Sequence, residues 1–515
     1  MAKVNAKLSP LVISLGEPGM TPMLCAGLGG LAASLRAILR EQAPSAEWPS
    51  LVSIGPGKAH VEKRRVTIDF GGSTEETLKA LFTASLRISE PLGVIDLPGT
   101  YDATHPLDVP VAVALQGAVK RTFLQHGKST SKAGAARTVT RDLGDGPQTM
   151  MVQPYASFAH QDAWSDVAYA VKRGAIELAG WAYPGAAQRH IAFGETRCSY
   201  SPSLALCACF AIVGCVSYQL PHNGGAIVIP EPIDLIEFAE ARRFLTPRTL
   251  VDVHVSGAGD AALSAALALR MDEVAQSARD SVQKLSAVIL RATAWDSKQK
   301  YRVATLTLGD VDEGVLDQYH AAVSSLPPRV IALKEQRKKE EQRDSFFVAP
   351  SPLRGLIADN LARARPWFVD FARLHQQLRD QARELSLDEK KGLITMVEKL
   401  EIAEHALVKS VHVALRQRFG AIADESRDNP ATMKNRFQGE RDKWRLAFAG
   451  AKTLDQLRAA LADLWSRAGA NEELRDHWPA VMQLLRPNNW RQARDLALVA
   501  LASYQREHKE EEKQS

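Results

Sequence analysis

Residues 486–504 read Arg486-Pro-Asn-Asn-Trp490-Arg-Gln-Ala-Arg494-Asp-Leu-Ala-Leu-Val-Ala-Leu-Ala-Ser-Tyr504. We expect Asn488 or Asn489 to cap a helix here, directly after the break at Pro487. One stripe of this helix is apolar or aromatic at helical spacing: Trp490, Ala493, Ala497, Leu498, Leu501 and Tyr504. A closing helix with so apolar a face must pack into a bundle, and the residues before it are expected to supply that bundle.

The pattern upstream of this helix is helical back to a change in composition at Lys334-Glu-Gln-Arg-Lys-Lys-Glu-Glu-Gln-Arg343, which indicates a linker. The expected breaks lie at Ser386, Asn429-Pro430, Lys452-Thr453, Gly469 and Pro487. We therefore predict an N-terminal region at 1–333, a charged linker at 334–345, a bundle of five or six helices at 346–506 and a frayed tail at 507–515.

Residues 1–333 mix short strands and helices, so the chain as a whole is predicted to be α+β, with a C-terminal all-α bundle. The expected strands are 11–15, 52–54, 66–70, 207–218, 226–230, 286–290 and 301–308. The expected helices are 23–39, 73–85, 164–173, 233–244, 261–271 and 312–324. Gly27, Gly29 and Gly30 inside the first helix predict close passage of another backbone, since glycine costs about 1 kcal/mol there.

Length and composition bound the function. A chain of 515 residues is too long for one core, and its 24% charged and 45% hydrophobic residues are ordinary for a globular protein. With a net charge of only +5, a nucleic-acid role requires local basic clusters. No run of 18 apolar residues exists and the N-terminus lacks the apolar core of a signal peptide, so we expect a cytoplasmic protein without a membrane partner.

Catalytic and metal-binding motifs are missing. Three of the five cysteines lie in the apolar run Leu204–Cys215, where their spacing fits no zinc pattern, so buried thiols are expected. No metal and no cofactor is predicted, and a non-enzymatic protein is favoured. Two alternatives stay open: a nucleotide-dependent enzyme that uses Gly16–Gly30, although G-x-G-x-x-G is not matched, and a protein–protein scaffold without nucleic acid.

The most asymmetric charge distribution lies between Val109 and Arg141, which contains no Asp or Glu. Its middle, His126–Arg137, is rich in Gly, Ser, Thr and Ala and is predicted to form a long mobile loop. The stretch carries six cations: Lys120, Arg121, Lys128, Lys132, Arg137 and Arg141. Because these charges repel one another without a polyanion, we favour a nucleic-acid contact over a solvated loop.

Two further segments are candidates for the same chemistry. Pro221-His222-Asn223-Gly224-Gly225 is first of all a hairpin turn, but an Asn at a rigid tip can also present donors and acceptors to base edges. Lys58–Arg65 forms a basic hairpin-like segment. It is either a solvated edge or a contact to a nucleic-acid backbone.

Four segments together resemble the large subunit of the type I CRISPR interference complex (Cascade), in its Myxan or I-B-like subgroup. They are Met23–Arg36, Trp181–His190, Phe346–Leu361 with Pro366-Trp367-Phe368, and Trp490–Tyr504. The family often has His-Arg where this chain has Leu24-Cys25, so no role is carried over to that pair.

The resemblance implies a non-catalytic subunit that recognises the protospacer-adjacent motif, binds and opens target double-stranded DNA in R-loop formation, and helps to recruit the effector. The implied partners are the guide RNA, the target duplex, and the backbone, handle-binding and small subunits of Cascade. A helicase–nuclease or a transposition adaptor would act downstream. The bundle would resemble the small subunit and support the displaced strand, while guide pairing reads most of the sequence.

The resemblance also suggests roles for individual residues. Those expected on the DNA backbone are Lys120, Arg121, Lys128, Lys132 and Arg137. Asn223 and Gly224 are candidates for reading the motif or wedging the duplex. Lys63, Arg64 and Arg65 are candidates for the RNA handle or the duplex backbone. The candidates for the displaced strand are Arg354, Arg363, Arg365, Lys434, Arg436 and Arg441.

Overall fold

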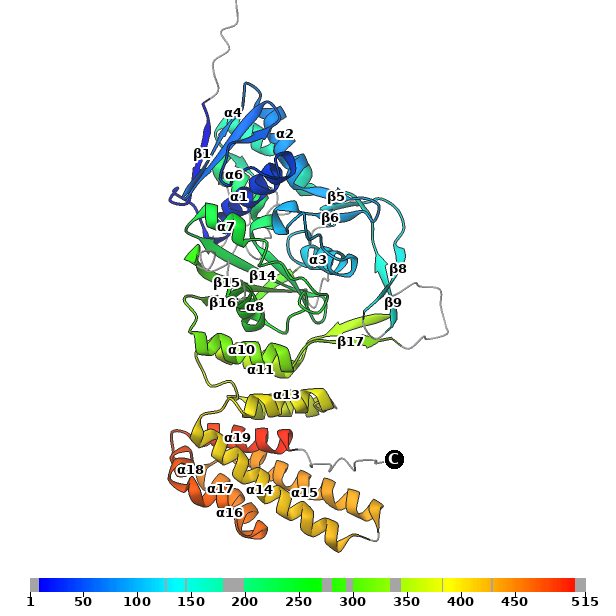
Figure 1. Cartoon of the computed structure of the whole chain (residues 1–515), viewed down its shortest axis with the longest axis vertical. Helices are drawn as coiled ribbons and strands as arrows, with labels where there is room; N and C mark the ends of the chain where they lie inside the picture. The colour runs from blue at the N-terminus through cyan, green and yellow to red at the C-terminus, as the bar shows by residue number, and fades with distance from the viewer. Residues whose placement is uncertain are drawn as a thin grey trace, which may run out of the picture. The chain divides into compact units, whose positions relative to one another are not determined.

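The computed structural model describes residues 9–125, 127–143, 146–178, 199–270, 280–292, 300–333, 344–381, 383–427 and 429–504. The chain forms two compact units, 1–312 with 328–350 and 313–327 with 351–515. The first unit is α+β and the second is helical, which confirms the predicted fold class (Figure 1). The segment Trp181–His190 and residues 334–343 of the linker predicted at 334–345 lie outside the described residues.

The division between the units differs from the expected single boundary near residue 334. Helix α10 (Glu313–Ser325) belongs to the helical unit, whereas strands β17 (Arg329–Ala332) and β18 (Phe346–Ala349) belong to the first unit and pair with each other. Residues 346–349 were predicted to be helical, and that prediction is wrong. The chain therefore passes between the units three times.

The first unit contains two antiparallel four-stranded sheets. One has the order β1-β4-β3-β2, with β1 (Leu11–Ser14), β4 (Arg65–Asp69), β3 (Gly57–Glu62) and β2 (Val52–Ile54). The other has the order β13-β14-β15-β16, with β13 (Val216–Leu220), β14 (Gly224–Pro232), β15 (Val282–Ala292) and β16 (Lys300–Leu308). Helix α8 (Ala258–Arg270) packs on β14, β15 and β16 (Figure 1).

The remaining elements of this unit are short. The helices are α2 (Thr74–Ser85), α3 (Val109–Thr122), α4 (Trp164–Arg173) and α7 (Leu235–Ala241), with 3-10 turns at Pro98–Thr100 and Ala159–Asp162. The two-stranded pairs are β5 (Arg87–Ser89) with β6 (Val94–Asp96), β7 (Thr130–Lys132) with β10 (Tyr155–Phe158), β8 (Arg137–Asp142) with β9 (Pro147–Val152), and β11 (Ile176–Glu177) with β12 (Ser199–Tyr200).

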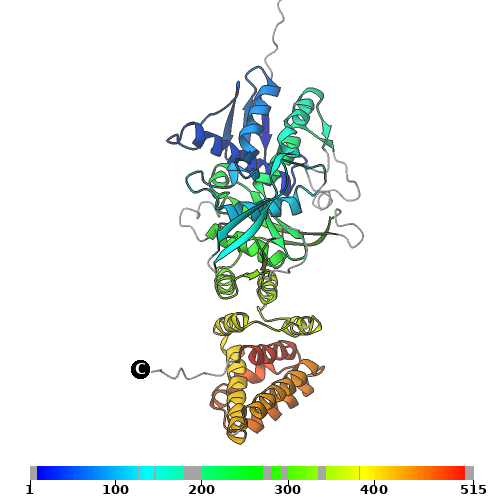
Figure 2. The same ribbon diagram turned by 90° about the vertical axis from the view of Figure 1, so that its right-hand side faces the viewer.

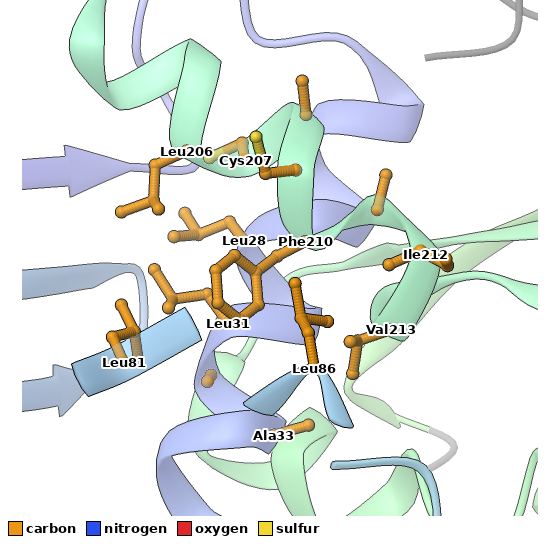
Figure 3. Close-up of a cluster of buried hydrophobic side chains, with 14 of the residues drawn as sticks. Leu28, Leu31, Ala33, Leu81, Leu86, Leu206, Cys207, Phe210, Ile212 and Val213 are labelled. Atoms are coloured by element: carbon orange, nitrogen blue, oxygen red, sulfur yellow. The ribbon is translucent and has the colours of Figure 1, made fainter. Parts of the chain in front are cut away.

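Two apolar helices cross at the centre of the first unit. Helix α1 (Pro22–Gln42) begins as predicted, with Thr21 accepting a hydrogen bond from the Leu24 amide and with Pro22 in the first turn. It packs closely against α6 (Pro202–Gly214), which lies next to it in Figure 1; Figure 2 shows the same unit turned by 90°. Figure 3 shows Leu28 and Leu31 of α1 beside Phe210 of α6, with Leu81 of α2 on the same cluster.

The glycines of α1 serve this crossing, as the sequence predicted. A Cβ on Gly27 would collide with the carbonyl of Cys207, and one on Gly30 with the backbone of Phe210 and Gly214. Such contacts let two backbones approach where larger residues would hold them apart. Although α1 is long and apolar enough to cross a membrane, 83% of its most apolar window is buried in this core.

Of the strand expected at 207–218, residues 216–218 belong to β13, whereas residues 207–214 are helical and belong to α6. The run is apolar on every side, so its periodicity could not separate a buried helix from a buried strand. Ser201 caps the helix through the Leu204 amide, and Pro202 occupies its first position. Cys207, Cys209 and Cys215 are buried as expected, and burial raises the pKa of each thiol.

The helical unit contains α10 and nine later helices in the part of the chain that the structure describes. They are α11 (Pro352–Leu361), α12 (Phe371–Asp380), α13 (Leu387–Val397), α14 (Ile402–Glu425), α15 (Pro430–Gly450), α16 (Leu454–Ala468), α17 (Glu472–Asp476), α18 (Trp478–Leu484) and α19 (Trp490–Ser503). The predicted number of five or six is therefore too low. The predicted breaks at Ser386, Asn429 and Thr453 are confirmed, because each side chain caps the helix that follows it.

Helix α19 is the centre of this unit, packed against α12, α13, α14 and α15. Asn489 stands at its N-cap as expected, but the side chain makes no capping hydrogen bond and donates instead to the Gln483 carbonyl at 3.2 Å. All residues from Asp495 to Leu501 are buried, a wider face than the predicted stripe.

Candidate nucleic-acid interface

Helix α3 ends in two of the predicted cations, Lys120 and Arg121, which lie in its last turn. Positive charge is favourable at the C-terminal end of a helix because the terminal carbonyls carry partial negative charge. The guanidinium of Arg121 donates a hydrogen bond to the Gln219 side-chain oxygen and another, at 3.5 Å, to Oδ1 of Asn223. The fold thus joins two predicted site residues that are 102 positions apart.

Asn223 stands at the tip of the hairpin between β13 and β14, whose predicted position is confirmed. His222 and Asn223 both have left-handed backbone conformations, with φ of 57° and 58°. Both side chains are exposed. Gly224 and Gly225 are buried, and a Cβ on Gly225 would meet the Arg121 carbonyl at 2.9 Å. Gly224 therefore belongs to the support of the tip, and in this structure it is not exposed for a motif contact.

Gln219 fixes this arrangement, and sequence reasoning missed it. Its Nε2 donates to the Ala114 carbonyl of α3 at 2.6 Å, while its oxygen accepts from Arg121. One side chain therefore ties the strand to the helix and orients the guanidinium. The available signal was a polar residue inside the apolar strand Val216–Leu220.

The charge at this site resides on Arg121. Burial lowers the pKa of its guanidinium, yet arginine remains protonated. Burial is the main cause that lowers the pKa of neighbouring His254 to about 4; the hydrogen bond to the Leu250 carbonyl opposes this shift, and the positive charge of Arg121 contributes to it. His254 is consequently neutral near pH 7, and Arg121 supplies one fixed positive charge behind the hairpin tip.

A second pair of predicted cations meets at Tyr155. The ammonium of Lys120 lies 4.8 Å from the centroid of the Tyr155 ring and 3.5 Å from Oγ1 of Thr130. Lys132 is the cross-strand partner of Tyr155 in the β7–β10 pair and is exposed. Tyr155 is a further residue that the sequence did not point to, since nothing before folding relates it to α3.

The segment that was predicted to be a long mobile loop contains the short strand β7 and ends at Arg137, where β8 begins, whereas residues 127–129 and 133–136 lie outside strands. Strand pairing gives Lys132 and Arg137 defined positions, opposite Tyr155 of β10 and Val152 of β9. Lys128 is exposed between α3 and β7, and Arg137 is exposed while donating to the Pro91 carbonyl at 3.2 Å. All five predicted backbone-contact residues thus belong to α3, β7, β8 and their connection. We call Lys120, Arg121, Lys128, Lys132 and Arg137 the α3–β8 cations.

The turn between β3 and β4 carries Lys63 and Arg64, and β4 begins at Arg65. All three residues are exposed. Arg65 pairs with Glu62, and Lys63 lies 3.6 Å from Asp234. Arg64 makes no ion pair within the described residues. This tip is therefore less uniformly positive than the α3–β8 cations.

In the helical unit the structure separates the six displaced-strand candidates. Arg354 is only 2% exposed and lies against the Tyr319 hydroxyl at 3.4 Å, so it is a core residue and its predicted strand contact is wrong. Arg363 and Arg365 are exposed after α11, and Arg365 lies 3.6 Å from Asp370.

The other three candidates lie on α15. Lys434 is exposed there, whereas Arg436 pairs with Glu425 at 3.1 Å and Arg441 donates to the Tyr504 carbonyl at 3.1 Å. The six candidates in the helical unit are therefore scattered, and most of them have partners within the protein.

Three glycines of the alternative nucleotide site, those inside α1, are already used in packing. Gly27 and Gly30 contact α6, and a Cβ on Gly29 would collide with the Phe238 ring. A phosphate-binding turn needs glycine amides open to the ligand at the start of a helix. Gly27, Gly29 and Gly30 lie inside a buried helix, which argues against a phosphate site at these three residues.

Comparisons with known proteins agree with this organisation. A family model described as the DevT N-terminal domain matches residues 12–209, and one described as the DevT C-terminal domain matches residues 396–515. The chain is also similar to the CRISPR-associated protein Cas8a1/Csx13 of Myxococcus xanthus (strain DK1622). The two are 50% identical over 510 residues, which cover 96% of this chain and 89% of that protein.

Proposed function

Because the chain belongs to the Cas8a1/Csx13 family of CRISPR large subunits, Myxan subgroup, we propose that it recognises the protospacer-adjacent motif within a type I RNA-guided surveillance complex. In this role it binds and opens the target duplex, without catalysing a reaction. Guide RNA, the other Cascade subunits and a downstream effector are its proposed partners. The effector is either a helicase–nuclease or a transposition adaptor.

The observation that carries the proposal is the hydrogen bond from Arg121 to Asn223 at the tip of the β13–β14 hairpin. Direct readout requires a side chain with donors and acceptors held in a fixed position, and the amide of Asn223 has both. Its backbone is set by the hairpin register, and Arg121 and Gln219 support it from behind. A narrow, rigid tip of this kind suits both reading a base edge and separating two strands.

The α3–β8 cations supply the second requirement, an electrostatic grip on phosphates. Residues 109–141 contain no carboxylate, so no acid within the segment competes with a phosphate for these charges. Contacts of this type position a duplex without reading its sequence. Lys120 and Arg121 lie on α3, the helix that holds the hairpin tip, which would place their phosphate contacts next to motif reading.

The remaining cations fit supporting roles in the same proposal. Lys63, Arg64 and Arg65, on the β3–β4 turn, are proposed contacts for the RNA handle or the duplex backbone. Exposed Arg363, Arg365 and Lys434 are proposed contacts for the displaced strand. Arg436 and Arg441 would contribute only after release from Glu425 and the Tyr504 carbonyl.

The salt dependence of duplex binding tests the proposal in the assembled, guide-loaded complex. Replacing Lys128, Lys132 and Arg137 with alanine removes exposed charges and leaves the buried support of the tip intact. Each lost phosphate contact should reduce the slope of log K against log salt by about 0.9, so the three together reduce it by up to about 2.7. The loss of affinity should shrink as the salt concentration rises.

The matched control is Lys172→Ala with Arg173→Ala, which removes two exposed charges from α4 in the same unit. The control should leave the slope unchanged. An equal slope in the triple variant and the wild type would refute the phosphate role. A complex that purifies without guide RNA would refute the wider assignment.

A further inference from the structure

The helical unit contains a cavity of about 130 Å³ that none of the predicted roles explains. Its apolar lining comes from Phe371, Leu374 and Leu378 of α12 and from Leu498 and Leu501 of α19. Leu374, Leu378 and Leu501 are 8%, 6% and 6% exposed, so the cavity has a nearly closed hydrocarbon floor.

Positive charge surrounds this floor. The rim carries five cations, Arg379, Arg383, Lys390, Arg441 and Arg445, against two carboxylates, Glu384 and Asp442. Three of the cations have partners: Arg445 pairs with Asp442 at 2.7 Å, Arg383 with Glu389 at 3.4 Å, and Arg441 with the Tyr504 carbonyl at 3.1 Å.

Two rim cations are left for a ligand. Arg379 is exposed and Lys390 is half-buried, and neither makes an ion pair with any residue that the structure describes. His375, also on the rim, adds no charge near pH 7, because burial lowers its pKa and the charges of Arg445 and Arg379 lower it further. These two cations would bind an anionic group placed above the apolar floor.

Volume and shape limit what enters the cavity. A dry cavity of about 150 Å³ lined by Leu, Ile and Phe holds a benzene molecule. The slightly smaller volume of about 130 Å³ suits one side chain of about the size of leucine. Nucleobases in single strands instead bind by stacking on exposed aromatic faces. The aromatic residue here, Phe371, is only 1% exposed and offers no such face.

The chain's own C-terminal segment does not match the cavity. Residues 505–515 include Glu507, Glu510, Glu511 and Glu512, but no aliphatic or aromatic residue that could fill the floor. The occupant therefore needs acidic residues and an apolar anchor in one segment, a combination typical of amphipathic helices that bind in grooves.

We propose that this cavity is a docking site for an acidic amphipathic segment of a protein partner. One apolar side chain of the partner fills the space between α12 and α19, and its carboxylates pair with Arg379 and Lys390. The site depends on neither DNA nor guide RNA, so its test is independent of the proposed motif recognition.

The test uses the full chain and a fluorescein-labelled synthetic peptide of about 15 residues, with Leu and Phe at helical spacing and Glu between them. Fluorescence anisotropy should show saturable binding. Replacing both Arg379 and Lys390 with Glu should raise the Kd at least about tenfold. Ala502→Phe, which fills the cavity from its α19 wall and leaves the rim charges in place, should do the same.

Arg373→Glu is the matched control, since Arg373 is exposed on α12 but does not line the cavity. It should leave the Kd unchanged, and a peptide with Lys in place of Glu should not bind. No saturable binding of the acidic peptide would overturn the proposal, as would binding that Ala502→Phe leaves intact. Labelled oligothymidine that binds in competition with the peptide and is lost in Ala502→Phe would assign the cavity to nucleic acid instead.

Discussion

Two titratable side chains hold α19 in the helical unit, and they respond to pH in opposite directions. Asp495 is buried and accepts hydrogen bonds from the amides of Asp370 and Ala372, at 2.9 and 3.0 Å, which caps the start of α12. On α14, Nε2 of His412 lies 3.0 Å from the Ala500 carbonyl and 3.1 Å from the Ser503 hydroxyl. When one of the two residues is replaced, the pH dependence of stability should show the contribution of the other.

The sign for Asp495 follows from its raised pKa. Burial raises it from 3.8 to about 6, although the Ala372 amide and Arg494 oppose the shift. The folded protein therefore binds a proton more tightly than the unfolded chain, and lowering the pH through this window stabilises the fold. As the pH falls from about 7.5 to about 4.5, the free energy of unfolding rises by about 2 kcal/mol through Asp495. Asp495→Asn lacks this gain.

The sign for His412 is the reverse. Burial lowers its pKa from 6.5 to about 4, opposed by the Ala500 carbonyl and reinforced by Lys409 and Arg416, so the folded protein holds the imidazole neutral. The unfolded chain takes up the proton first as the pH falls. Over the same pH interval, protonation of His412 in the unfolded chain lowers the free energy of unfolding by about 2.5 kcal/mol. His412→Gln, whose amide can still donate to the Ala500 carbonyl, avoids this loss.

Hydrogen exchange measured by mass spectrometry on the full chain can test both signs, because peptides from α14 and α19 report opening of the helical unit alone. After correction for intrinsic exchange rates, the opening free energy of Asp495→Asn should fall by about 2 kcal/mol relative to that of the wild type as the pH is lowered from about 7.5 to about 4.5. His412→Gln should gain about 2.5 kcal/mol. Parallel curves for wild type and both variants would refute the assigned pKa shifts, and inverted signs would refute the linkage argument.

Two further substitutions test the hairpin and the helix crossing. Asn223→Gly keeps the left-handed backbone but removes the amide, so it should weaken discrimination between motifs by about 1–3 kcal/mol in competition binding, without loss of guide-RNA assembly. Lys132→Ala should instead weaken all motifs equally, and a uniform loss in Asn223→Gly would make Asn223 a turn residue only. Gly30→Ala should destabilise the α1–α6 crossing by about 1–3 kcal/mol in thermal unfolding. Gly16→Ala, where a Cβ meets nothing within 4 Å, should be neutral, and equal stability of the two variants would contradict the packing argument.

Local signals predicted much of the fold because caps and glycines act over a few residues. Thr21 with Pro22, and Ser386, mark helix starts that the structure confirms. The same kind of cap stands at Ser201-Pro202 before α6. The run that follows is apolar on every side, so its sequence shows no helical period. The start of α12 could not be predicted, because Asp370 adopts φ of 67° and the side chain that caps this turn, Asp495, comes from a helix 125 positions away.

The site was predictable in its charges but not in its geometry. A run without carboxylates identified the α3–β8 cations, and a turn signal identified Asn223. Nothing local connects Arg121 with Asn223, since their contact depends on Gln219 and on the packing of α3 against β13. The prediction for Arg354 was wrong because it rested on charge alone. Charge does not show that the side chain is buried against Tyr319.

The size of the hairpin tip bears on how specificity is divided in such a complex. In the proposed role, a tip of two exposed side chains, His222 and Asn223, would reach few base pairs, and each well-made contact to a base edge would discriminate by about 1–3 kcal/mol. That is enough to select a short motif and far too little to select one site in a genome. The rest of the specificity must come from pairing with the guide. Phosphate contacts by the α3–β8 cations would then set how long the duplex stays bound while pairing begins, and this sequence-independent step is where salt should act most strongly.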